Sequence, residues 1–160
     1  MTRIACVLMV AVAGLSAASA CHSPYKRVGG GCFYFSGNIK RNWFGARDYC
    51  KSLEQGGSLA IVDDCSLMRP LWNHILFTYG KSSHWLGASD MHHEGSWTWV
   101  DGSPVAMGMP FWSFNEPNND GQEHCLEFWS AGNGYFNDGQ CSRVESFICQ
   151  APRSKNSWSR

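Results

Sequence analysis

One stretch of the chain decides both its fold and its chemistry: residues 111–141 read FWSFNEPNNDGQEHCLEFWSAGNGYFNDGQC. The stretch is rich in side chains that carry hard oxygen donors. Ca²⁺ takes about six to eight oxygen ligands and tolerates irregular geometry, which suits ligands carried by loops. These residue types therefore predict a Ca²⁺ site with places left open for a further ligand. The candidate metal ligands are Glu116, Asn118, Glu123, Asn137 and Asp138, the last also through its carbonyl oxygen.

Two neighbouring hydroxyl groups of a sugar could fill the open places of such a site. A hydroxyl bound to Ca²⁺ still has a proton to donate and a lone pair with which to accept. A glutamate carboxylate accepts a hydrogen bond and an asparagine amide donates one, so each ligand residue could hold both metal and sugar. A cis bond at Pro117 would aim the side chains on either side of it into one site. Only about 5–6% of X-Pro bonds in folded proteins are cis, so the cis form is a hypothesis here.

Residues 1–20 are typical of a secretory signal peptide. Arg3 supplies a positive start, residues 4–15 form an apolar run, and the Ala-Ser-Ala of residues 18–20 fits a cleavage site. The run is shorter than the roughly 20 apolar residues that a membrane-spanning helix needs. We therefore expect a secreted, extracellular protein that begins at Cys21 and does not insert into a membrane. An uncleaved membrane anchor is the alternative.

The rest of the chain is expected to form one domain, residues 21–150, followed by a basic polar tail, residues 151–160. Roughly 100 to 150 residues suit a single core. The full chain has thirteen Lys and Arg and thirteen Asp and Glu, so loss of Arg3 would leave a net charge near −1. Because nucleic-acid binding usually requires a strongly basic face, nucleic acid is not an expected partner.

The cysteines of the expected mature chain predict a disulfide framework, as is usual for secreted proteins. Their number is odd, so one thiol lacks an internal partner, and spacing alone leaves the connectivity open. No two of them have the Cys-x-x-Cys spacing typical of zinc or redox sites. The seven are Cys21, Cys32, Cys50, Cys65, Cys125, Cys141 and Cys149.

Hydrophobic spacing predicts an α+β domain with two helices. Apolar residues recur every three or four positions over residues 42–54, with Asn42 as the N-cap, and again over residues 64–79. Pro70 should lie in the first turn of the second helix or mark its start. A long loop, residues 101–122, is expected to carry function. Short strand-like runs are found at residues 84–88, 96–100, 125–129 and 146–150.

Several motifs, in their order along residues 21–150, resemble those of the C-type lectin-like domain. They combine the first helix, a central core strand, a Trp-x-Trp strand and the stretch described above. A lone Glu-Pro-Asn would be weak evidence, but the ordered set is specific. The matching segments are Trp43 to Cys50, Gly57 to Ala60, Trp85-Leu86-Gly87, Trp97-Thr98-Trp99, Asp101-Gly102, Trp112, Glu116-Pro117-Asn118, Glu123 and Phe136-Asn137-Asp138.

This resemblance implies a disulfide-stapled α+β fold with two helices, small antiparallel sheets and a long calcium-binding loop. By the same resemblance, the five candidate ligands bind both Ca²⁺ and sugar. The Glu-Pro-Asn signature implies mannose, glucose, N-acetylglucosamine and fucose, whereas Gln-Pro-Asp would imply galactose. The implied partners are glycans on microbial or cell surfaces, with a role in innate immunity. Useful binding would need several linked sites, which a homo-oligomer could supply.

The resemblance also implies which cysteines pair. The expected bridges are Cys21–Cys32, Cys50–Cys149 and Cys125–Cys141. Cys65 is then the odd cysteine, and it is either buried and inert or joins two subunits.

Two departures from the family pattern concern the metal sites. Phe136 stands where the family usually has Trp, beside the main ligands. A second Ca²⁺ site would use Asp90, Glu94 and Asn119, but Asn119 and His124 stand where carboxylates are common. Fewer negative ligands weaken the affinity for a hard cation, so this second site is expected to be weak or empty.

Other functions are less favoured by the residues. His92 and His93 are adjacent, and adjacent side chains of a strand point to opposite faces, so they would not converge on zinc. Glu116 and Glu123 could be imagined as a glycosidase pair, but one of them would have to stay protonated, which a neighbouring Ca²⁺ opposes. We therefore expect no enzyme activity. The serious alternative is a domain of this fold that binds a protein or mineral surface without sugar.

The aromatic residues are assigned mainly to the core. Trp85, Trp97, Trp99 and Trp112 are expected to be buried rather than to stack on sugars. Phe111 and Phe114 are more open to a role in binding.

Overall fold

The computed structural model describes residues 20–54, 56–106 and 111–152. All but the last residue of the predicted signal peptide, and the predicted tail from residue 153, lie outside the described residues. In the part of the chain that is described, no helix combines the length and apolar character needed to cross a membrane.

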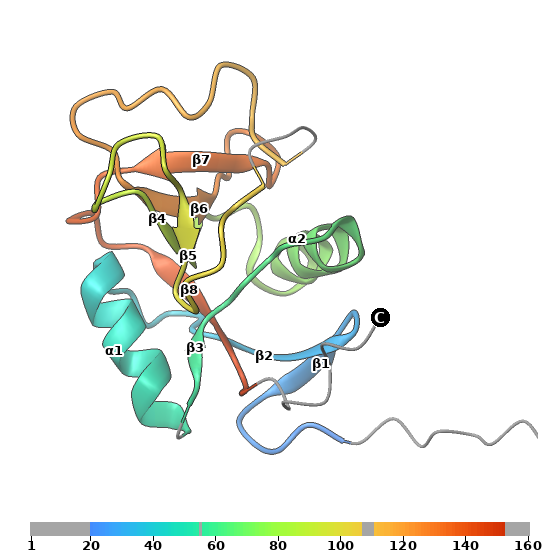
Figure 1. Ribbon diagram of the computed structural model, residues 1–160. Coiled ribbons are helices and arrows are strands. Elements are labelled where there is room, and N and C mark those ends of the chain that lie inside the picture. The colour runs from blue at the N-terminus through green and yellow to red at the C-terminus, as the bar shows by residue number, and fades with distance from the viewer. Residues whose placement is uncertain (1–19, 55, 107–110, 153–160) are drawn as a thin grey trace, which may run out of the picture.

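The described strands form one sheet in the order β1-β2-β8-β4-β6-β7, with β3 beside β8 and β5 beside β4. Neighbouring strands are antiparallel except β4 and β8, which run parallel. Figure 1 shows the sheet between the two helices, with the loop that precedes β6 above β7. The strands are β1 (Lys26–Val28), β2 (Gly31–Phe35), β3 (Ser58–Leu59), β4 (His84–Ser89), β5 (Thr98–Trp99), β6 (Cys125–Phe128), β7 (Phe136–Gly139) and β8 (Ser146–Gln150).

The four predicted strand runs are all found, although β5 is shorter than expected. The local sequence pattern did not single out the short strands β1, β2, β3 and β7, although the resemblance included the segment Gly57 to Ala60 that contains β3. β7 has the sequence FNDG, which lacks the apolar alternation that indicates a strand. Its pairing with β6 over four residues supplies the order that its own sequence does not. Asn137 and Asp138 therefore lie on a strand, whereas the other candidate ligands lie on the loop.

Helix α1 (Trp43–Leu53) confirms the first predicted helix. The side-chain oxygen of Asn42 accepts a hydrogen bond from the backbone N–H of Gly45 at 2.8 Å, the expected N-cap contact. The helix buries Trp43, Ala46 and Cys50. The indole N–H of Trp43 donates to the carbonyl of Leu86 at 2.9 Å, so this face of α1 is fixed to β4.

Helix α2 (Cys65–Tyr79) confirms the second predicted helix, but the predicted place of Pro70 is wrong. The helix starts at Cys65, five residues before Pro70, with Asp64 as its N-cap, so Pro70 lies beyond the first turn. Without an N–H, Pro70 cannot donate to the carbonyl four residues before it. Burial of Leu71, Trp72 and Ile75 in one core cluster offsets this loss.

The disulfides pair as the resemblance implied. Bridges join Cys21 to Cys32, Cys50 to Cys149 and Cys125 to Cys141. Cys65 is a free and exposed thiol at the first position of α2, so the expectation that it is buried is wrong. Cys65 and Ser66 at the start of α2 are exposed, and the helix reaches the core at Leu67 and Met68.

The four tryptophans predicted for the core are buried. Trp85 is 0% exposed, and Trp97, Trp99 and Trp112 are 4% exposed or less. Phe136 is also 0% exposed and packs edge-on against Trp112, with ring centroids 5.9 Å apart. Phe136, which stands where the family usually has Trp, therefore fills space in the core. It precedes the candidate ligands Asn137 and Asp138 on β7, but its side chain does not face them.

The turn that joins β6 to β7 is held close to α2. Gly134 has a φ of +83°, and a Cβ atom there would overlap the indole ring of Trp72. Only glycine allows both this left-handed backbone and this close approach. The contact sets the position of β7 relative to α2, and so the position of the candidate ligands that β7 carries.

Gly134→Ala should therefore destabilise the protein more than a matched change at another left-handed glycine. Gly102, in the turn after β5, has a φ of +87° and open space around it. Gly102→Ala should show only the strain of a positive φ, of order 1–3 kcal/mol. Gly134→Ala should add about 1–3 kcal/mol for overpacking. Urea unfolding of both variants measures the difference, and equal losses would contradict this account of the turn.

Candidate functional site

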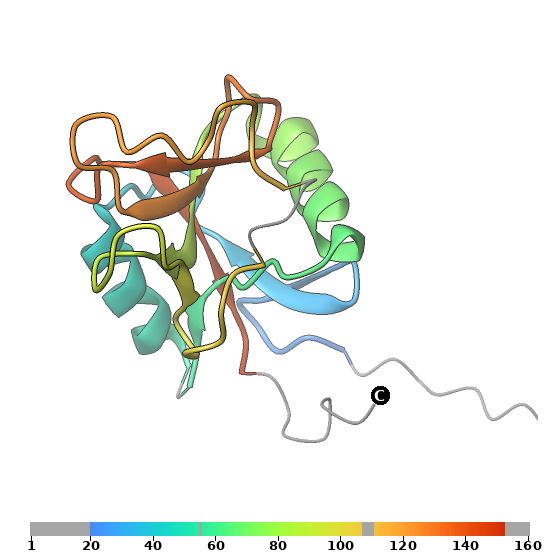
Figure 2. The same cartoon turned by 45° about the horizontal axis from the view of Figure 1, so that its top comes forward.

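The candidate ligands gather at the edge of the sheet formed by β7. The loop of residues 111–124 lies over this edge, as the orange trace above β7 in Figure 1 and in the tilted view of Figure 2 shows. The loop begins at an isolated bridge between Trp112 and Phe136 and ends where β6 begins. One end of the loop is therefore anchored on β7, which carries Asn137 and Asp138, and the other on its neighbour β6.

Asp138 fastens the loop to β7. One carboxylate oxygen accepts a hydrogen bond from the backbone N–H of Asn118 at 3.2 Å, and the other from that of Asn119 at 2.7 Å. Asp138 is only 1% exposed. A buried carboxylate that accepts two backbone N–H bonds orders the segment that donates them. The Glu-Pro-Asn segment is thus held against the strand by the side chain of another candidate ligand.

The Glu116–Pro117 bond is cis, as hypothesised from the sequence. The side chains on either side of it point toward each other, because the amide nitrogen of Asn118 donates to Oε1 of Glu116 at 3.1 Å. Oε2 of Glu116 is buried and has no hydrogen-bond partner among the described residues. A buried carboxylate oxygen without a donor is costly, and a bound cation would satisfy it.

The two remaining candidate ligands are attached to the same group. The backbone N–H of Glu123 donates to the side-chain oxygen of Asn119 at 2.9 Å. The amide nitrogen of Asn137 donates to the backbone carbonyl of Asp138 and, at 3.1 Å, to a carboxylate oxygen of Glu127. The structure therefore links the other four predicted residues to Asp138 through one network of hydrogen bonds, directly for Asn118 and Asn137 and through a neighbouring residue for Glu116 and Glu123.

The electrostatics of this group also point to a cation. Burial, followed by the nearby carboxylates of Asp138 and Glu123, together raise the pKa of Glu116 to about 7. Burial and the charge of Asp138 raise the pKa of Glu123, which Arg143 partly lowers. The nearby negative charges disfavour the ionised forms of Glu116 and Glu123, and a bound divalent cation would reverse this. An all-oxygen donor set of this charge fits Ca²⁺.

Sequence reasoning missed two residues beneath the site. Glu127 on β6 is 0% exposed and faces Asn137, its partner in the pairing of β6 with β7. Arg143 donates to its carboxylate at 2.6 Å. Burial raises the pKa of Glu127, whereas Arg143 lowers it. A charged residue in the middle of the apolar run CLEF was the one sequence signal for this support.

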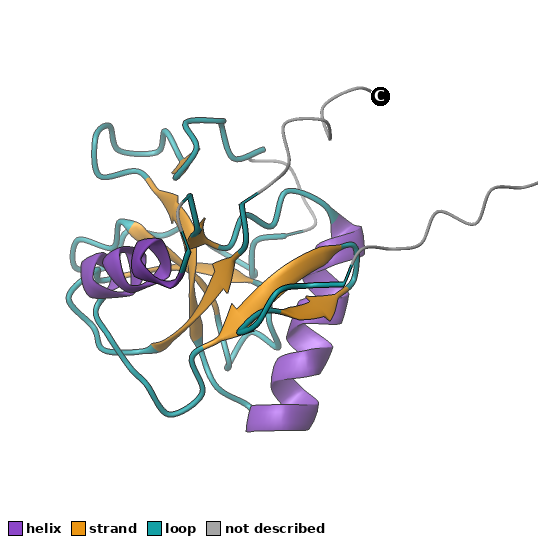
Figure 3. Ribbon diagram, turned by 90° about the horizontal axis from the view of Figure 1, so that it is seen from below, coloured by secondary structure: helices purple, strands orange, loops and turns teal. Residues whose placement is uncertain are grey.

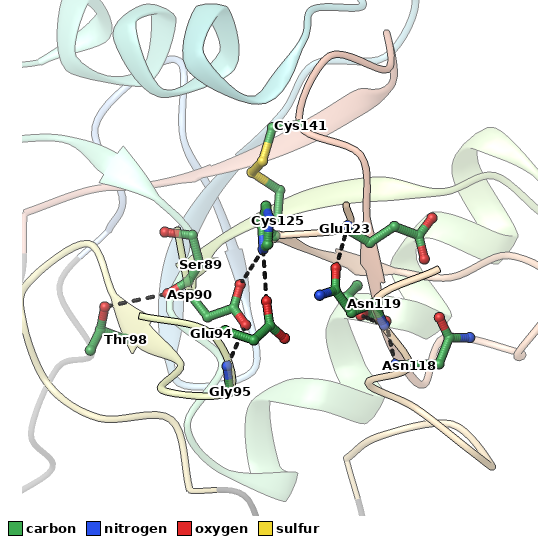
Figure 4. A network of polar contacts seen from close by, with 12 residues as sticks. Ser89, Asp90, Glu94, Gly95, Thr98, Asn118, Asn119, Glu123, Cys125 and Cys141 are labelled. Carbon is green, nitrogen blue, oxygen red and sulfur yellow. Dashed lines mark hydrogen bonds and ion pairs between the residues drawn. A yellow bond between two sulfur atoms is a disulfide. The ribbon is translucent and has the colours of Figure 1, made fainter. Parts of the chain in front are cut away.

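The residues expected for a second Ca²⁺ site are only partly brought together. Asp90 and Glu94 lie beside His124, and the donor atoms of these three lie within 4.8 Å of one another. Asn119 is not part of that group, since its side-chain oxygen accepts from the backbone of Glu123. Figure 4 shows Asp90 and Glu94 on one side of Cys125, and Asn119 and Glu123 on the other.

The remaining sequence candidates are placed as follows. His92 and His93 are exposed on the turn after β4. Phe111 stacks on Phe136, with ring centroids 5.6 Å apart, and so belongs to the core margin. Phe114 is 89% exposed and lies two residues before Glu116, where it could contact a ligand of the loop.

Comparison with known proteins agrees with this architecture. The family model described as the lectin C-type domain matches residues 39–151. The CD209 antigen of Homo sapiens is 37% identical over 124 residues, which are 76% of this chain and 28% of that protein. The C-type lectin domain family 4 member M of Hylobates lar is 34% identical over 126 residues, which are 77% of this chain and 29% of that protein. The chain spans less than a third of the length of these two relatives.

Solved structures show the same fold. The carbohydrate-recognition domain of the mouse scavenger receptor C-type lectin superimposes with a TM-score of 0.70 at 30% identity, covering 84% of this chain and 98% of that one. A trimeric structure of the Kupffer cell C-type lectin receptor Clec4f superimposes with a TM-score of 0.65 at 29% identity, covering 85% of each chain. The sheet order, the three disulfides and the family match agree, and the chain belongs to the lectin C-type domain family.

Proposed function

We propose that this protein is a secreted, Ca²⁺-dependent lectin that binds mannose-type hexoses: mannose, glucose, N-acetylglucosamine and fucose. The observation that carries the proposal is the hydrogen-bond network that joins Glu116, Asn118, Glu123 and Asn137 to Asp138, whose carboxylate is buried, in a chain of the lectin C-type domain family. A solved relative at 30% identity is described as a carbohydrate-recognition domain, which supports the same class of ligand. We propose binding without catalysis, because holding a sugar through a bound Ca²⁺ needs no acid–base pair.

The chemistry of binding follows from the donors. A bound Ca²⁺ would supply open coordination places for two neighbouring sugar hydroxyls. Glu116 would accept a hydrogen bond from one hydroxyl and Asn118 would donate one to the other. Asp138 accepts a hydrogen bond from the backbone of Asn118, which would orient this residue before the sugar arrives. Glu127 and Arg143 act beneath it as positioning residues for Asn137.

The proposed setting is extracellular, with glycans on microbial or cell surfaces as partners in innate immunity. A single shallow hexose site offers few contacts, so useful binding would require several linked sites, where avidity adds about 10² to 10⁴. A relative at 29% identity is trimeric, which supports a homo-oligomer here. The exposed thiol of Cys65 would be accessible for a bond between subunits.

The alternative is binding of a protein or mineral surface without sugar. It is not favoured, since such a role gives no reason for a buried, unpaired oxygen on Glu116 beside two further carboxylates. Calcium-independent binding to a protein partner, without retention on mannose, would favour it.

Substitution of Glu116 or Asn118 by Ala should abolish Ca²⁺-dependent retention on immobilised mannose, because each side chain would contact both metal and sugar. The parent protein should elute with EDTA. Asp120→Asn serves as the matched control: it lies in the same loop, is exposed and is not one of the five candidates. Retained mannose binding by Glu116→Ala, with a normal thermal melt, would refute the site.

Exchange of the two polar groups tests the sugar preference. Glu116→Gln combined with Asn118→Asp reverses which side of the site donates and which accepts. The double variant should lose inhibition by free mannose and gain inhibition by free galactose, measured as competition for a glycan surface in saturating Ca²⁺. An unchanged preference would show that other residues select the sugar.

The pH dependence of the stabilisation by Ca²⁺ tests the metal assignment. The pKa of Glu116 is raised from 4.5 to about 7 in the folded chain, so the folded state holds this proton more tightly than the unfolded chain. This group therefore lowers the free energy of unfolding as pH rises from about 4.5 to 7, and the stability present below that window is lost above it.

Ca²⁺ competes with that proton, so the rise in Tm produced by saturating Ca²⁺ should be larger at pH 7.5 than at pH 5. Scanning calorimetry of the parent and of Glu116→Gln measures this. In Glu116→Gln the rise should be small at both values. A Ca²⁺-induced shift that is equal at both pH values in the parent would contradict the assignment.

A further inference from the structure

We propose that Asp90, Glu94 and His124 form a Zn²⁺ site, separate from the candidate Ca²⁺ and sugar site. The three donors come from two segments far apart in sequence that meet at one end of the sheet. Asp90 directly follows β4, Glu94 lies in the turn after it, and His124 directly precedes β6. No other group of three such residues among the described part of the chain has donor atoms this close.

The two distances from the imidazole nitrogen of His124 to the carboxylate oxygens are close to those between ligand atoms of a tetrahedral zinc site. Nδ1 of His124 lies 3.1 Å from Oδ1 of Asp90 and 3.4 Å from Oε2 of Glu94. Zinc binds imidazole nitrogen and carboxylate oxygen at about 2.0–2.2 Å in a tetrahedron, which places neighbouring ligand atoms about 3.3–3.5 Å apart. The two carboxylates lie within 4.8 Å of each other, so a zinc ion could be bound by all three atoms once the exposed side chain of Glu94 adjusts.

The backbone holds two of these residues in place. Ser89 pairs with Cys125 in the antiparallel register of β4 and β6, so the next residues on each side, Asp90 and His124, face each other. The N–H of Asp90 donates to the carbonyl of His124 at 3.3 Å. The disulfide from Cys125 to Cys141 fixes the start of β6 directly after His124.

The second carboxylate oxygen of Asp90 is also fixed. It accepts a hydrogen bond from the N–H of Gly95 at 2.8 Å, and the side chain of Asp90 is 1% exposed. Outer contacts of this kind orient a ligand carboxylate and keep its other oxygen free for metal. The side chain of Glu94 is 56% exposed, so the site is open to solvent on one side and a water molecule could take the fourth place.

The donor types select zinc rather than calcium. Ca²⁺ prefers about six to eight oxygen ligands, whereas imidazole nitrogen suits Zn²⁺ and its neighbours in the transition series. Here two carboxylates and one imidazole converge, and Asn119 is engaged with Glu123 instead. The same residue that makes this place poor for Ca²⁺, His124, makes it suitable for Zn²⁺.

Titration of the secreted protein with Zn²⁺ tests the site. The protein carries Cys65→Ser, to remove the exposed free thiol, and is kept in saturating Ca²⁺ so that the carboxylates around Asp138 are occupied. Isothermal titration with ZnCl₂ should show one equivalent bound. Substitution of Co²⁺ for Zn²⁺ should give the intense visible absorption of a tetrahedral ion, and excess Ca²⁺ should not displace either metal.

Three variants decide the assignment. His124→Ala should lose the bound equivalent, and Glu94→Gln, an exposed change that leaves the fold intact, should weaken it clearly. His92→Ala is the matched control on the same turn and should bind like the parent. The proposal is overturned if the parent takes up no zinc, or if His124→Ala and Glu94→Gln both bind zinc as the parent does; in that case the three residues form ion pairs only.

A fourth variant tests selectivity. His124→Asp replaces the nitrogen donor with oxygen, so the affinity for Zn²⁺ should fall and a second equivalent of Ca²⁺ should bind. Unchanged zinc affinity in His124→Asp would refute the role given to the imidazole.

Discussion

The hydrogen bonds from the backbone of Asn118 and Asn119 to the carboxylate of Asp138 are the constraint on which the rest of the site depends. They join a loop with little regular structure to a strand within the sheet. Without them, Glu116 and Asn118 would be attached to the core only through the two ends of a long segment. Because Asp138 is itself buried on β7, the position of this strand also fixes the position of the loop bonded to it. A site on a rigid element is positioned more accurately than a site on a loop alone.

The support continues downward into the sheet. Asp138 and Asn137 pair with Leu126 and Glu127 of β6, and Glu127 is neutralised by Arg143. A fully buried charge is stable only when it is paired and hydrogen-bonded, and Glu127 meets both conditions. The buried pair is therefore better understood as fixing the register of β6 and β7 than as adding stability of its own. The turn that joins β6 to β7 packs on α2 and holds the other end of these two strands in place.

Much of this arrangement could be predicted from the sequence. The helices follow from apolar spacing and from Asn42 as N-cap, and the disulfides and core tryptophans follow from the family resemblance. The residues that could not be predicted are those whose order comes from partners distant in the chain. β7 has no strand pattern of its own and is ordered by β6, and Pro70 is tolerated within α2 because of the burial around it. The grouping of His124 with Glu94 depends on the register of β4 against β6, which no local pattern specifies.

The hairpin of β1 and β2, together with the end of β8, lies at the side of the molecule opposite the loop above β7, as Figure 1 and the view from below in Figure 3 show. The N–H of Ala151 donates to the carbonyl of Cys32, so both described ends of the chain are held at that side. A tether attached at either end would therefore present the loop outward, away from the surface that carries it. If many copies were tethered to a surface in this way, the loops above β7 of all of them would face the surrounding medium.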